Sequence, residues 1–512
     1  MSRPNHDEPA ETPVASIARH SLVYSLAPLI QRFLALALVR IYTTKLNAAQ
    51  LGVTQISDLM FTALIQISGT NLLAAVVRFY FDQKDERDRR LVISSAILFL
   101  SVVSWTIVGV AFLFRVPLTE FLFVTTDPLL ASDDLVSCLA VALATVPLAL
   151  SSETAFRYLQ IQQRSGLITT LRVSKSTLEM GLKVLFLVWF EYGVIGFLLA
   201  TLIGELITNL FLTGWVVSRI GVRFSWRVMA PMLRYSAPLV LVGLCQMGLN
   251  QIDRLLLRTL GPEDDAMGWT GIYGLGYMLG WMVQLVVVGS FMQIWQPWIF
   301  GVKDEQRQRE LVRRVSTWAL FAVGLASIAL MCFGREFVYA LSGKPEYLEA
   351  TTVVPWIAAG YVFFALNGLS QVPMFIAKRT WPMFWLNLLA VVVKVGLCFA
   401  LIPMYGFVGA AIATLATFIL LGWLGHVLAG KIAGARFEHG RMLGMLALVL
   451  AIMGLTLWID AAFTATPSGM FTPMSAVKAL LFFAALGVLW LGMLQSDERS
   501  QCIEKLRAKL GR

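Results

Sequence analysis

The apolar stretches of this chain and the positive charges between them restrict its fold more than any other feature. The 512 residues are 58% hydrophobic and only 14% charged. They contain about fourteen apolar stretches near the length of roughly 20 residues that a membrane-spanning helix needs. Backbone groups in lipid must be hydrogen-bonded within their own helix, so we expect every stretch to be α-helical. The expected spans are residues 21–41, 51–77, 91–114, 134–156, 171–190, 194–217, 235–259, 269–296, 315–339, 351–376, 382–402, 407–429, 442–461 and 473–494.

Lysine and arginine lie mostly on one side of the predicted membrane. When the gaps between spans are numbered alternately, 29 of the 41 Lys and Arg residues fall in the two tails and the even gaps. The odd gaps hold only Lys45, Arg115, Arg335 and Lys344. The positive-inside rule places the richer side in the cytoplasm, so we expect an even number of spans and two cytoplasmic termini. The net charge of +10 follows from this bias and does not indicate a nucleic-acid partner.

The chain contains an internal repeat with an offset of about 210 residues. The pattern Tyr-Gly-x-x-Gly-x-x-x-Ala-Thr-Leu begins at Tyr192 and again at Tyr405, and Lys183 and Lys394 precede it at matching positions. The offsets predict an all-α polytopic membrane protein made of two parallel six-helix lobes and two extra C-terminal helices. The predicted parts are a cytoplasmic tail at 1–20, an N-lobe at 21–230, a C-lobe at 231–430, helices 13 and 14 at 431–494, and a basic cytoplasmic tail at 495–512.

Charged residues inside the predicted spans are the candidates for a functional site, because each is costly to place in a membrane. Eight cations lie within or at the ends of spans, at Arg32, Arg40, Lys175, Lys183, Arg254, Arg258, Lys394 and Lys478. The acids in the spans of the two halves include Asp58, Glu179, Glu205 and Asp253. One interpretation is a set of structural pairs, such as Glu179 with Lys175 or Lys183 and Asp253 with Arg254 or Arg258.

The surplus of cations over acids favours a second interpretation, in which a water-filled cavity between the halves binds an anion. Arginine donates two parallel hydrogen bonds to a diphosphate or carboxylate, and lysine acts as a point charge. Lys183 and Lys394 lie near mid-membrane at repeat-related positions, so we expect both to face one cavity. The predicted substrate-binding residues are Arg32, Arg40, Lys183, Arg254, Arg258 and Lys394.

Acids within the spans are the candidates for coupling transport to an ion gradient. Glu205 is the first candidate, because no basic residue lies within four positions of it and burial away from a cation suits a proton carrier. A hydrogen-bonded structural acid is the alternative interpretation of Glu205. Asp58, Glu179 and Asp253 are the other candidates.

Motifs of nucleotide-binding proteins and of hydrolytic enzymes are missing from the sequence. It has no Walker A loop, no G-x-G-x-x-G, no H-E-x-x-H and no G-x-S-x-G. The five cysteines are scattered and form no C-x-x-C pair. We therefore expect no cofactor, no metal and no catalytic residue, and any transport must draw on a gradient or on the substrate itself.

Five segments resemble a known family of flippases, and they lie at 39–53, 77–80, 250–257, 271–274 and 402–414. Their order and spacing are similar to those of the oligosaccharide (O-antigen type) flippases of polysaccharide biosynthesis. These belong to the multidrug/oligosaccharidyl-lipid/polysaccharide exporter superfamily. The resemblance implies fourteen helices in two lobes around a central cationic cavity, in the bacterial cytoplasmic (inner) membrane.

The resemblance also implies a substrate and partners. Alternating access would move a polyprenyl-diphosphate-linked oligosaccharide outward for assembly of a surface polysaccharide, such as lipopolysaccharide or exopolysaccharide. The polymerase and the chain-length regulator of the same pathway are implied partners. Coupling to protons or Na⁺ is implied for some members of the superfamily.

Three other functions fit parts of the same pattern. A lipid II flippase shares the spans and the cationic cavity, but the quoted segments resemble the oligosaccharide branch more closely. A multidrug antiporter of the same superfamily would need acidic residues for cationic drugs. A membrane polymerase or ligase would need a large outer loop with catalytic groups, whereas the outer gaps are short and contain no histidine. We therefore predict a transporter and not an enzyme.

Overall fold

The structure is a computed structural model that describes residues 38–123, 130, 132–162, 164–263, 265–377, 379, 381–462 and 473–490. All regular elements in these residues are helical, which confirms the predicted fold class. The first group of helices is α2 (Ala48–Ile67), α3 (Leu72–Asp82), α4 (Glu86–Leu113), α5 (Arg115–Leu122), α6 (Ser132–Ile161), α7 (Ser165–Val184), η1 (Leu185–Trp189), α8 (Gly193–Thr208), η2 (Asn209–Thr213) and α9 (Gly214–Ile220). The second group is α10 (Trp226–Leu260), α11 (Ala266–Met282), η3 (Val283–Val288), α12 (Gly289–Phe300), α13 (Glu305–Leu341), η4 (Pro345–Thr352), α14 (Val354–Ile376), α15 (Trp381–Ala433), α16 (His439–Ala462) and α17 (Pro473–Val488).

Ten helices in the described part of the chain are long and apolar enough to cross a membrane. The longest, α15, joins two predicted spans across Gly406. The predicted span at 171–190 corresponds to α7 and η1, and the last predicted span corresponds to the shorter helix α17. Most of the first predicted span, with Arg32, lies outside the described residues, as does the predicted basic tail. The exact number of fourteen therefore stays a prediction, while the multi-pass membrane class is confirmed.

Local sequence signals explain where several helices begin. Asn47 and Gln50 form a capping box at the start of α2: the Asn47 side chain accepts from the Gln50 backbone at 2.8 Å, and the Gln50 side chain accepts from the Asn47 backbone at 3.0 Å. The Asp304 side chain accepts from the backbone N–H groups of Gln306 and Arg307 and caps α13. These polar caps mark the ends of helices whose interiors are almost wholly apolar.

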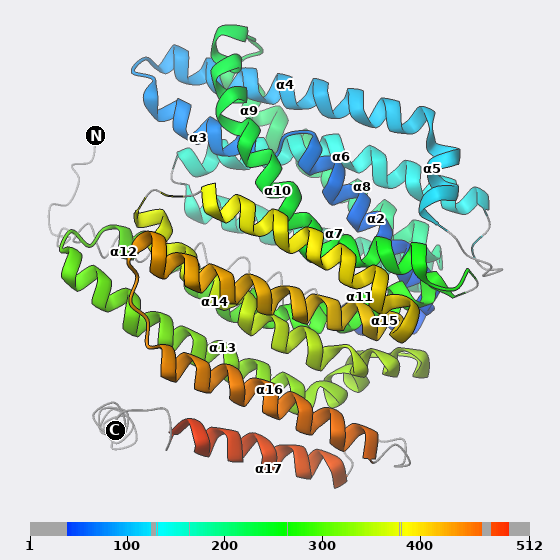
Figure 1. Ribbon diagram of the computed structural model, residues 1–512. Helices are drawn as coiled ribbons and strands as arrows, with labels where there is room; N and C mark the ends of the chain where they lie inside the picture. Colours follow the sequence, from blue (N-terminus) through cyan, green and yellow to red (C-terminus); the bar gives the residue numbers. More distant parts are fainter. Residues whose placement is uncertain are drawn as a thin grey trace, which may run out of the picture.

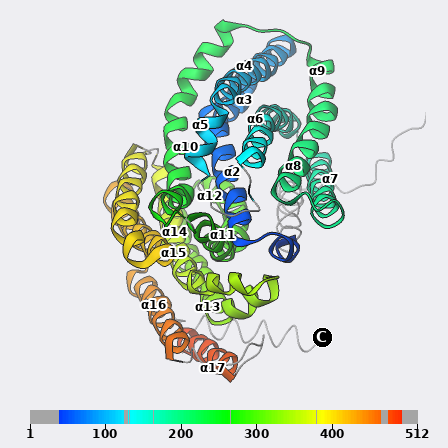
Figure 2. The same ribbon diagram turned by 90° about the vertical axis from the view of Figure 1, so that its right-hand side faces the viewer.

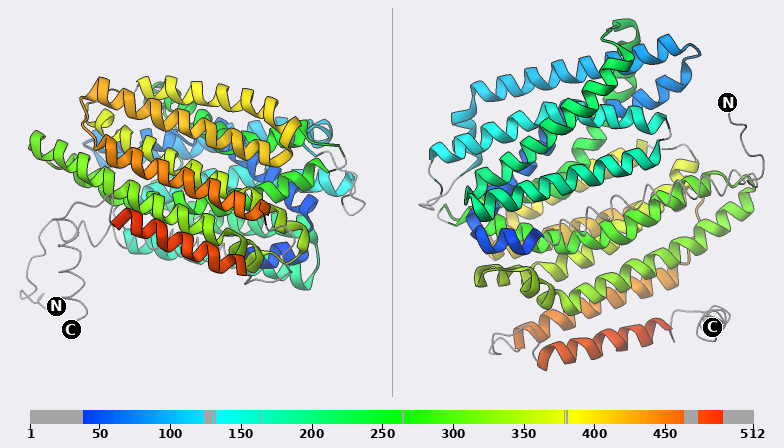
Figure 3. Two further views of the ribbon diagram at one scale, coloured as in Figure 1. Left: turned by 60° about the horizontal axis from the view of Figure 1, so that its bottom comes forward. Right: turned by 180° about the vertical axis from the view of Figure 1, so that it is seen from behind.

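The helices form two groups, with α10 crossing between them (Figures 1 and 2). We call α2 to α9 the N half and α10 to α17 the C half. The first part of α10 packs against α3 and α4, and its Met229 and Met232 belong to the apolar core of the N half. Its second part packs along α15, where Leu249 and Leu257 join the larger core of the C half. Helices α16 and α17 pack on α13 at one edge of the bundle (Figure 3).

The repeated motif has a glycine of positive φ at the same place in both halves. Gly193 follows Tyr192 with φ of 58°, and Gly406 follows Tyr405 with φ of 61°. Only glycine adopts this region without strain, which explains its place in both copies of the motif. The shared conformation supports the predicted repeat, whereas the exact lobe boundaries stay a prediction.

The two halves are joined tightly at the end of the bundle that the charge pattern assigns to the outside. Helices α2 and α11 cross at glycines: a Cβ at Gly52 would lie 2.0 Å from the carbonyl oxygen of Met267, and a Cβ at Gly271 would lie 2.0 Å from that of Ala48. The Tyr347 hydroxyl donates to the carbonyl of Leu46 at 3.0 Å. The outer ends of the two halves are therefore closed against each other.

Candidate functional site

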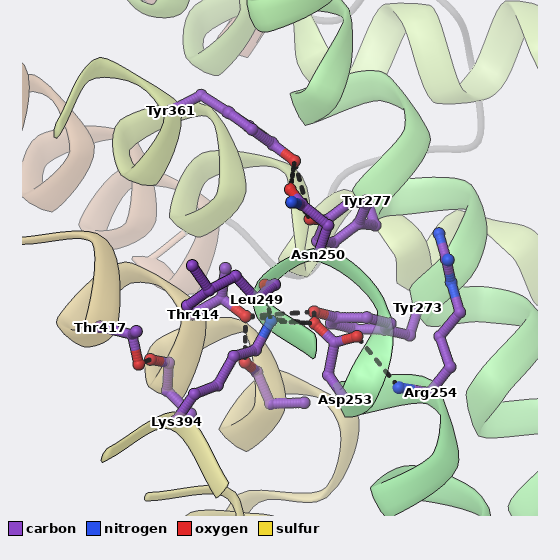
Figure 4. A network of polar contacts seen from close by, with 12 residues as sticks. Leu249, Asn250, Asp253, Arg254, Tyr273, Tyr277, Tyr361, Lys394, Thr414 and Thr417 are labelled. Carbon is purple, nitrogen blue, oxygen red and sulfur yellow. Dashed lines mark hydrogen bonds and ion pairs between the residues drawn. The ribbon is translucent and has the colours of Figure 1, made fainter. Parts of the chain in front are cut away.

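A buried polar network lies in the C half, where α10, α11 and α15 meet (Figure 4). Lys394 Nζ donates to the carbonyl of Leu249 at 2.6 Å and to Asp253 Oδ2 at 2.8 Å, and both charged side chains have no exposed surface. The Tyr273 hydroxyl donates to the same carboxylate oxygen at 2.6 Å, and the Thr414 hydroxyl lies 3.3 Å from it. The charges are thus compensated without water, as burial in low dielectric requires.

A second group of polar side chains continues this network along α10. The hydroxyls of Tyr277 and Tyr361 lie 2.7 Å apart. Asn250 Oδ1 lies 3.4 Å from the Tyr277 hydroxyl and 3.3 Å from the Tyr361 hydroxyl, and it accepts from the one that does not donate to the other. The network joins α10, α11 and α14, so it fixes how these helices pack in the C half (Figure 4).

The prediction that Lys183 and Lys394 face one cavity is wrong for Lys394. It is locked to Asp253, which the sequence analysis paired instead with Arg254 or Arg258. Arg254 contacts Asp253 only through its backbone N–H, at 3.0 Å. The internal repeat gives the physical reason. The positions 210 to 213 residues before Asp253 hold Arg40, Ile41, Tyr42 and Thr43, so the N half has no matching carboxylate to bury Lys183.

Lys183 instead lines a cavity of about 230 Å³ in the N half, together with Asp58, Gln55, Phe197 and Thr201. Its ammonium lies 4.1 Å from the centre of the Phe197 ring. The Asp58 side chain is exposed, although it lies in the middle of α2. An exposed carboxylate within a span faces an internal space that water enters, because its exposure to lipid would be far more costly.

Arg254 lies in the C half on α10, which packs against the helix α2 that carries Asp58. Its charge and that of Lys183 both act on Asp58. Its guanidinium carbon lies 5.2 Å from the centre of the Tyr277 ring and points away from the Asp253 carboxylate (Figure 4). Arg254 is only 8% exposed, yet its Nε has no hydrogen-bond partner among the described residues. We call Asp58, Lys183 and Arg254 the central charge cluster.

Glu205 is not the isolated acid that the sequence analysis expected. Lys175 Nζ donates to Glu205 Oε1 at 2.5 Å and lies 3.8 Å from Glu179 Oε1. The partner comes from the adjacent helix α7, which a search of neighbouring sequence positions misses. Glu179 packs directly on Gly204, where a Cβ would lie 2.3 Å from its Cγ. The role of Glu205, Glu179, Asp58 or Asp253 in ion coupling stays a prediction.

Two other predicted arginines lie at the closed end and not in the central charge cluster. Arg40 Nη1 donates to the carbonyl of Ala340 at 2.6 Å, and Arg258 Nη2 donates to the carbonyl of Glu120 at 3.1 Å. Each bond joins one half to the other. The partners are backbone carbonyls, which no sequence pattern identifies. Of the six predicted binding residues, the structure places Lys183 in one cavity with Asp58, and Arg254 on α10, which packs against the helix of Asp58.

Metal-binding side chains do not gather in the part of the chain that the structure describes. No group of three or more His, Cys, Asp or Glu residues there is placed to hold a metal ion.

Comparisons with known proteins agree with this architecture. The sequence profile of the family described as "Polysaccharide biosynthesis protein" matches residues 17–303, more than half of the chain. Among solved structures, a lipid II flippase MurJ in an inward closed conformation superposes with a TM-score of 0.71 at 13% identity, covering 91% of this chain and 97% of that chain. An inward-facing multidrug resistance MATE family transporter of the MOP superfamily gives 0.65 at 16% identity, covering 81% and 98%. No curated protein sequence gives a significant match.

At these identities the solved structures show a shared fold and nothing about the substrate. The chain is a multi-pass membrane protein with a transporter fold. The family match confirms the family that the sequence motifs predicted, and the chain belongs to the family of polysaccharide biosynthesis proteins.

Proposed function

We propose that this protein moves a polyprenyl-diphosphate-linked oligosaccharide from the inner to the outer leaflet of the bacterial cytoplasmic membrane. It would do so by alternating access, for assembly of a surface polysaccharide. The observation that carries the proposal is the central charge cluster, in which cations from opposite halves both act on Asp58, beside the cavity that Lys183 and Asp58 line. The family match and the fold of a lipid II flippase support it.

The charge balance of the cluster suits an anionic head group. Two cations, Lys183 and Arg254, face one carboxylate, Asp58, which leaves a net charge of +1. A diphosphate carries about two negative charges, and a guanidinium binds two of its oxygens at once. With the inside negative, outward movement of an anion is favoured by about 2.3 kcal/mol per charge for each 100 mV. The membrane potential would therefore drive much of the transport step.

The closed outer end indicates which contacts must change during transport. The outward-open state requires separation of Arg40 from Ala340 and of Tyr347 from Leu46. These are hydrogen bonds to backbone carbonyls, each worth about 1 kcal/mol net, so they break without unfolding either half. The buried Lys394–Asp253 pair lies within the C half, so we propose that this half moves as a rigid unit.

Lipid II is the second candidate substrate, because the MurJ structure superposes with a TM-score of 0.71. It also carries a diphosphate on a polyprenyl chain, so the same cations would serve it. A cationic drug is disfavoured, because the central charge cluster has a net positive charge. The cytoplasmic termini and an association with the polymerase and chain-length regulator belong to the same proposal.

Complementation separates these functions. A host that lacks its own copy of the gene receives the wild-type chain, Lys183→Gln, Arg254→Gln or Arg309→Gln, where Arg309 is an exposed arginine of α13 that serves as control. We expect Arg309→Gln to restore surface glycan, and the two cluster variants to leave lipid-linked glycan in the inner leaflet at equal protein level. Normal export by both cluster variants contradicts the proposal. Rescue of a strain depleted of its lipid II flippase would favour lipid II.

A further inference from the structure

The charges within the spans are of two kinds, and the difference is visible in their contacts. The lysines Lys175, Lys394 and Lys478 are each held by a carboxylate at 2.5 to 2.8 Å. In contrast, Asp58, Lys183 and Arg254 make no side-chain hydrogen bond and no ion pair with the described residues. Lys183 and Arg254 instead lie over the aromatic rings of Phe197 and Tyr277. The side chains of the central charge cluster thus differ from these three lysines, because they have no hydrogen-bonded or ion-paired partner among the described residues.

Asp58 is a carboxylate on which both cations of the central charge cluster act. It lines the same cavity as Lys183. Glu179 lies one helical turn before Lys183 and acts on it more strongly than Asp58 does, but Glu179 also lies 3.8 Å from Lys175, whereas Asp58 is the carboxylate that senses both Lys183 and Arg254. The Asp58 side chain is exposed to the cavity that it lines together with Lys183.

We propose that Asp58 is the internal counter-anion of the binding site. In the empty transporter its carboxylate balances Lys183 and Arg254 across the two halves, and an incoming anionic head group displaces it from them. This inference rests on the proposed function, since it assumes an anionic substrate. Asp58 therefore weakens binding, and in the empty protein it lowers the uncompensated charge of the cluster from two positive charges to one.

The first test measures competition between the Asp58 carboxylate and an anionic ligand for the two cations. The purified full-length chain in nanodiscs of neutral lipid is titrated with farnesyl diphosphate as the probe, using wild type, Asp58→Asn and Lys183→Gln. We expect Asp58→Asn to bind the probe about tenfold more tightly, because a like charge is removed from a poorly screened site, and Lys183→Gln to bind it more weakly. Asp460→Asn removes the carboxylate partner of Lys478 away from the cavity and serves as the matched control, with unchanged affinity.

The second test needs no ligand, so it separates this inference from the proposed function. Melting temperatures are compared for wild type, Asp58→Asn, Lys183→Gln and the double variant. Asp58→Asn should lower the melting temperature of the wild type and have a clearly smaller effect in the Lys183→Gln background. Where Asp58→Asn fails to give a monodisperse protein, Asp58→Ser replaces it in both tests.

The outcomes are distinct. Two results overturn the proposal that Asp58 is a counter-anion. One is that the decreases in melting temperature of the two single variants add up in the double variant. The other is that Asp58→Asn binds farnesyl diphosphate no more tightly than wild type. Non-additive melting temperatures together with no binding of farnesyl diphosphate by any variant support the proposal that Asp58 is a counter-anion. That result contradicts the proposed substrate class instead.

Discussion

The Lys394–Asp253 pair should be the most sensitive polar contact of the C half. The test is Lys394→Met, which keeps a long unbranched side chain and removes the ammonium. Both partners have no exposed surface in the folded protein, so water does not reach the carboxylate that the substitution leaves behind. The carbonyl of Leu249, which accepts from the same ammonium at 2.6 Å, loses that donor as well.

The expected loss is large because removal of one partner leaves the other charge buried and alone. Such a change costs about 3–5 kcal/mol, and an unsatisfied buried carbonyl adds about 1 kcal/mol or more. Asp253 keeps the hydroxyl of Tyr273 at 2.6 Å, which offsets part of the loss. A net destabilisation of about 3 kcal/mol is therefore the expected value, and Asp253→Asn in the same chain should recover part of it.

Lys478→Met is the matched control. Lys478 is 2% exposed and pairs at 2.7 Å with Asp460, whose side chain is 37% exposed. Water replaces the lost ammonium at Asp460, so this substitution should cost about 1 kcal/mol. Thermal unfolding of the three variants in one detergent, followed by tryptophan fluorescence, gives the comparison. If the melting temperature of Lys394→Met equals or exceeds that of Lys478→Met, burial of the Lys394–Asp253 pair does not have the expected effect on stability.

Three further predictions concern topology, the closed end and coupling. Cysteines at the exposed positions Lys303 and Glu349 should react with a membrane-impermeant maleimide from inside and outside respectively, and the reverse result contradicts the assigned orientation. Gly52→Leu places a Cβ 2.0 Å from the Met267 carbonyl oxygen, so it should separate α2 from α11 and increase labelling at the outer end, and unchanged labelling would contradict the closed contact. Because a lysine of α7 already holds the Glu205 carboxylate at 2.5 Å, Glu205→Gln should lower stability and leave the response of flipping in vesicles to a pH gradient intact. Loss of that response would make Glu205 the proton carrier.

Hydropathy and charge were sufficient to predict the helical membrane class, because the physics of a span is local. Twenty apolar residues in lipid must be helical, whatever lies beside them. The predicted span at 235–259 lies within α10, Trp226–Leu260, which extends beyond the apolar stretch at its first end. A search for apolar stretches misses the charged first turns of a long helix, so it places the start of that helix too late in the sequence.

The contacts of the charged residues were not predictable in the same way, because they depend on which helices are neighbours. Lys183 and Lys394 are equivalent in the repeat, yet one faces a cavity and the other is buried with Asp253. The difference arises on α10, more than 100 residues before Lys394 in sequence. Glu205 and Lys175 are 30 residues apart and meet because α7 and α8 pack side by side. Sequence spacing identified the charged positions but not their partners.

The cations within the spans are therefore not equally available to a ligand. A count of charges over all spans treats each lysine as equally available, whereas Lys175, Lys394 and Lys478 are held in ion pairs. Lys183 and Arg254, one from each half, are not held in such pairs. Both of their charges act on Asp58. A ligand that binds both cations would link the two halves electrostatically, and its departure would return them to Asp58. The site is thus suited to respond to an anion by a change in how the halves are held together, which is what alternating access requires.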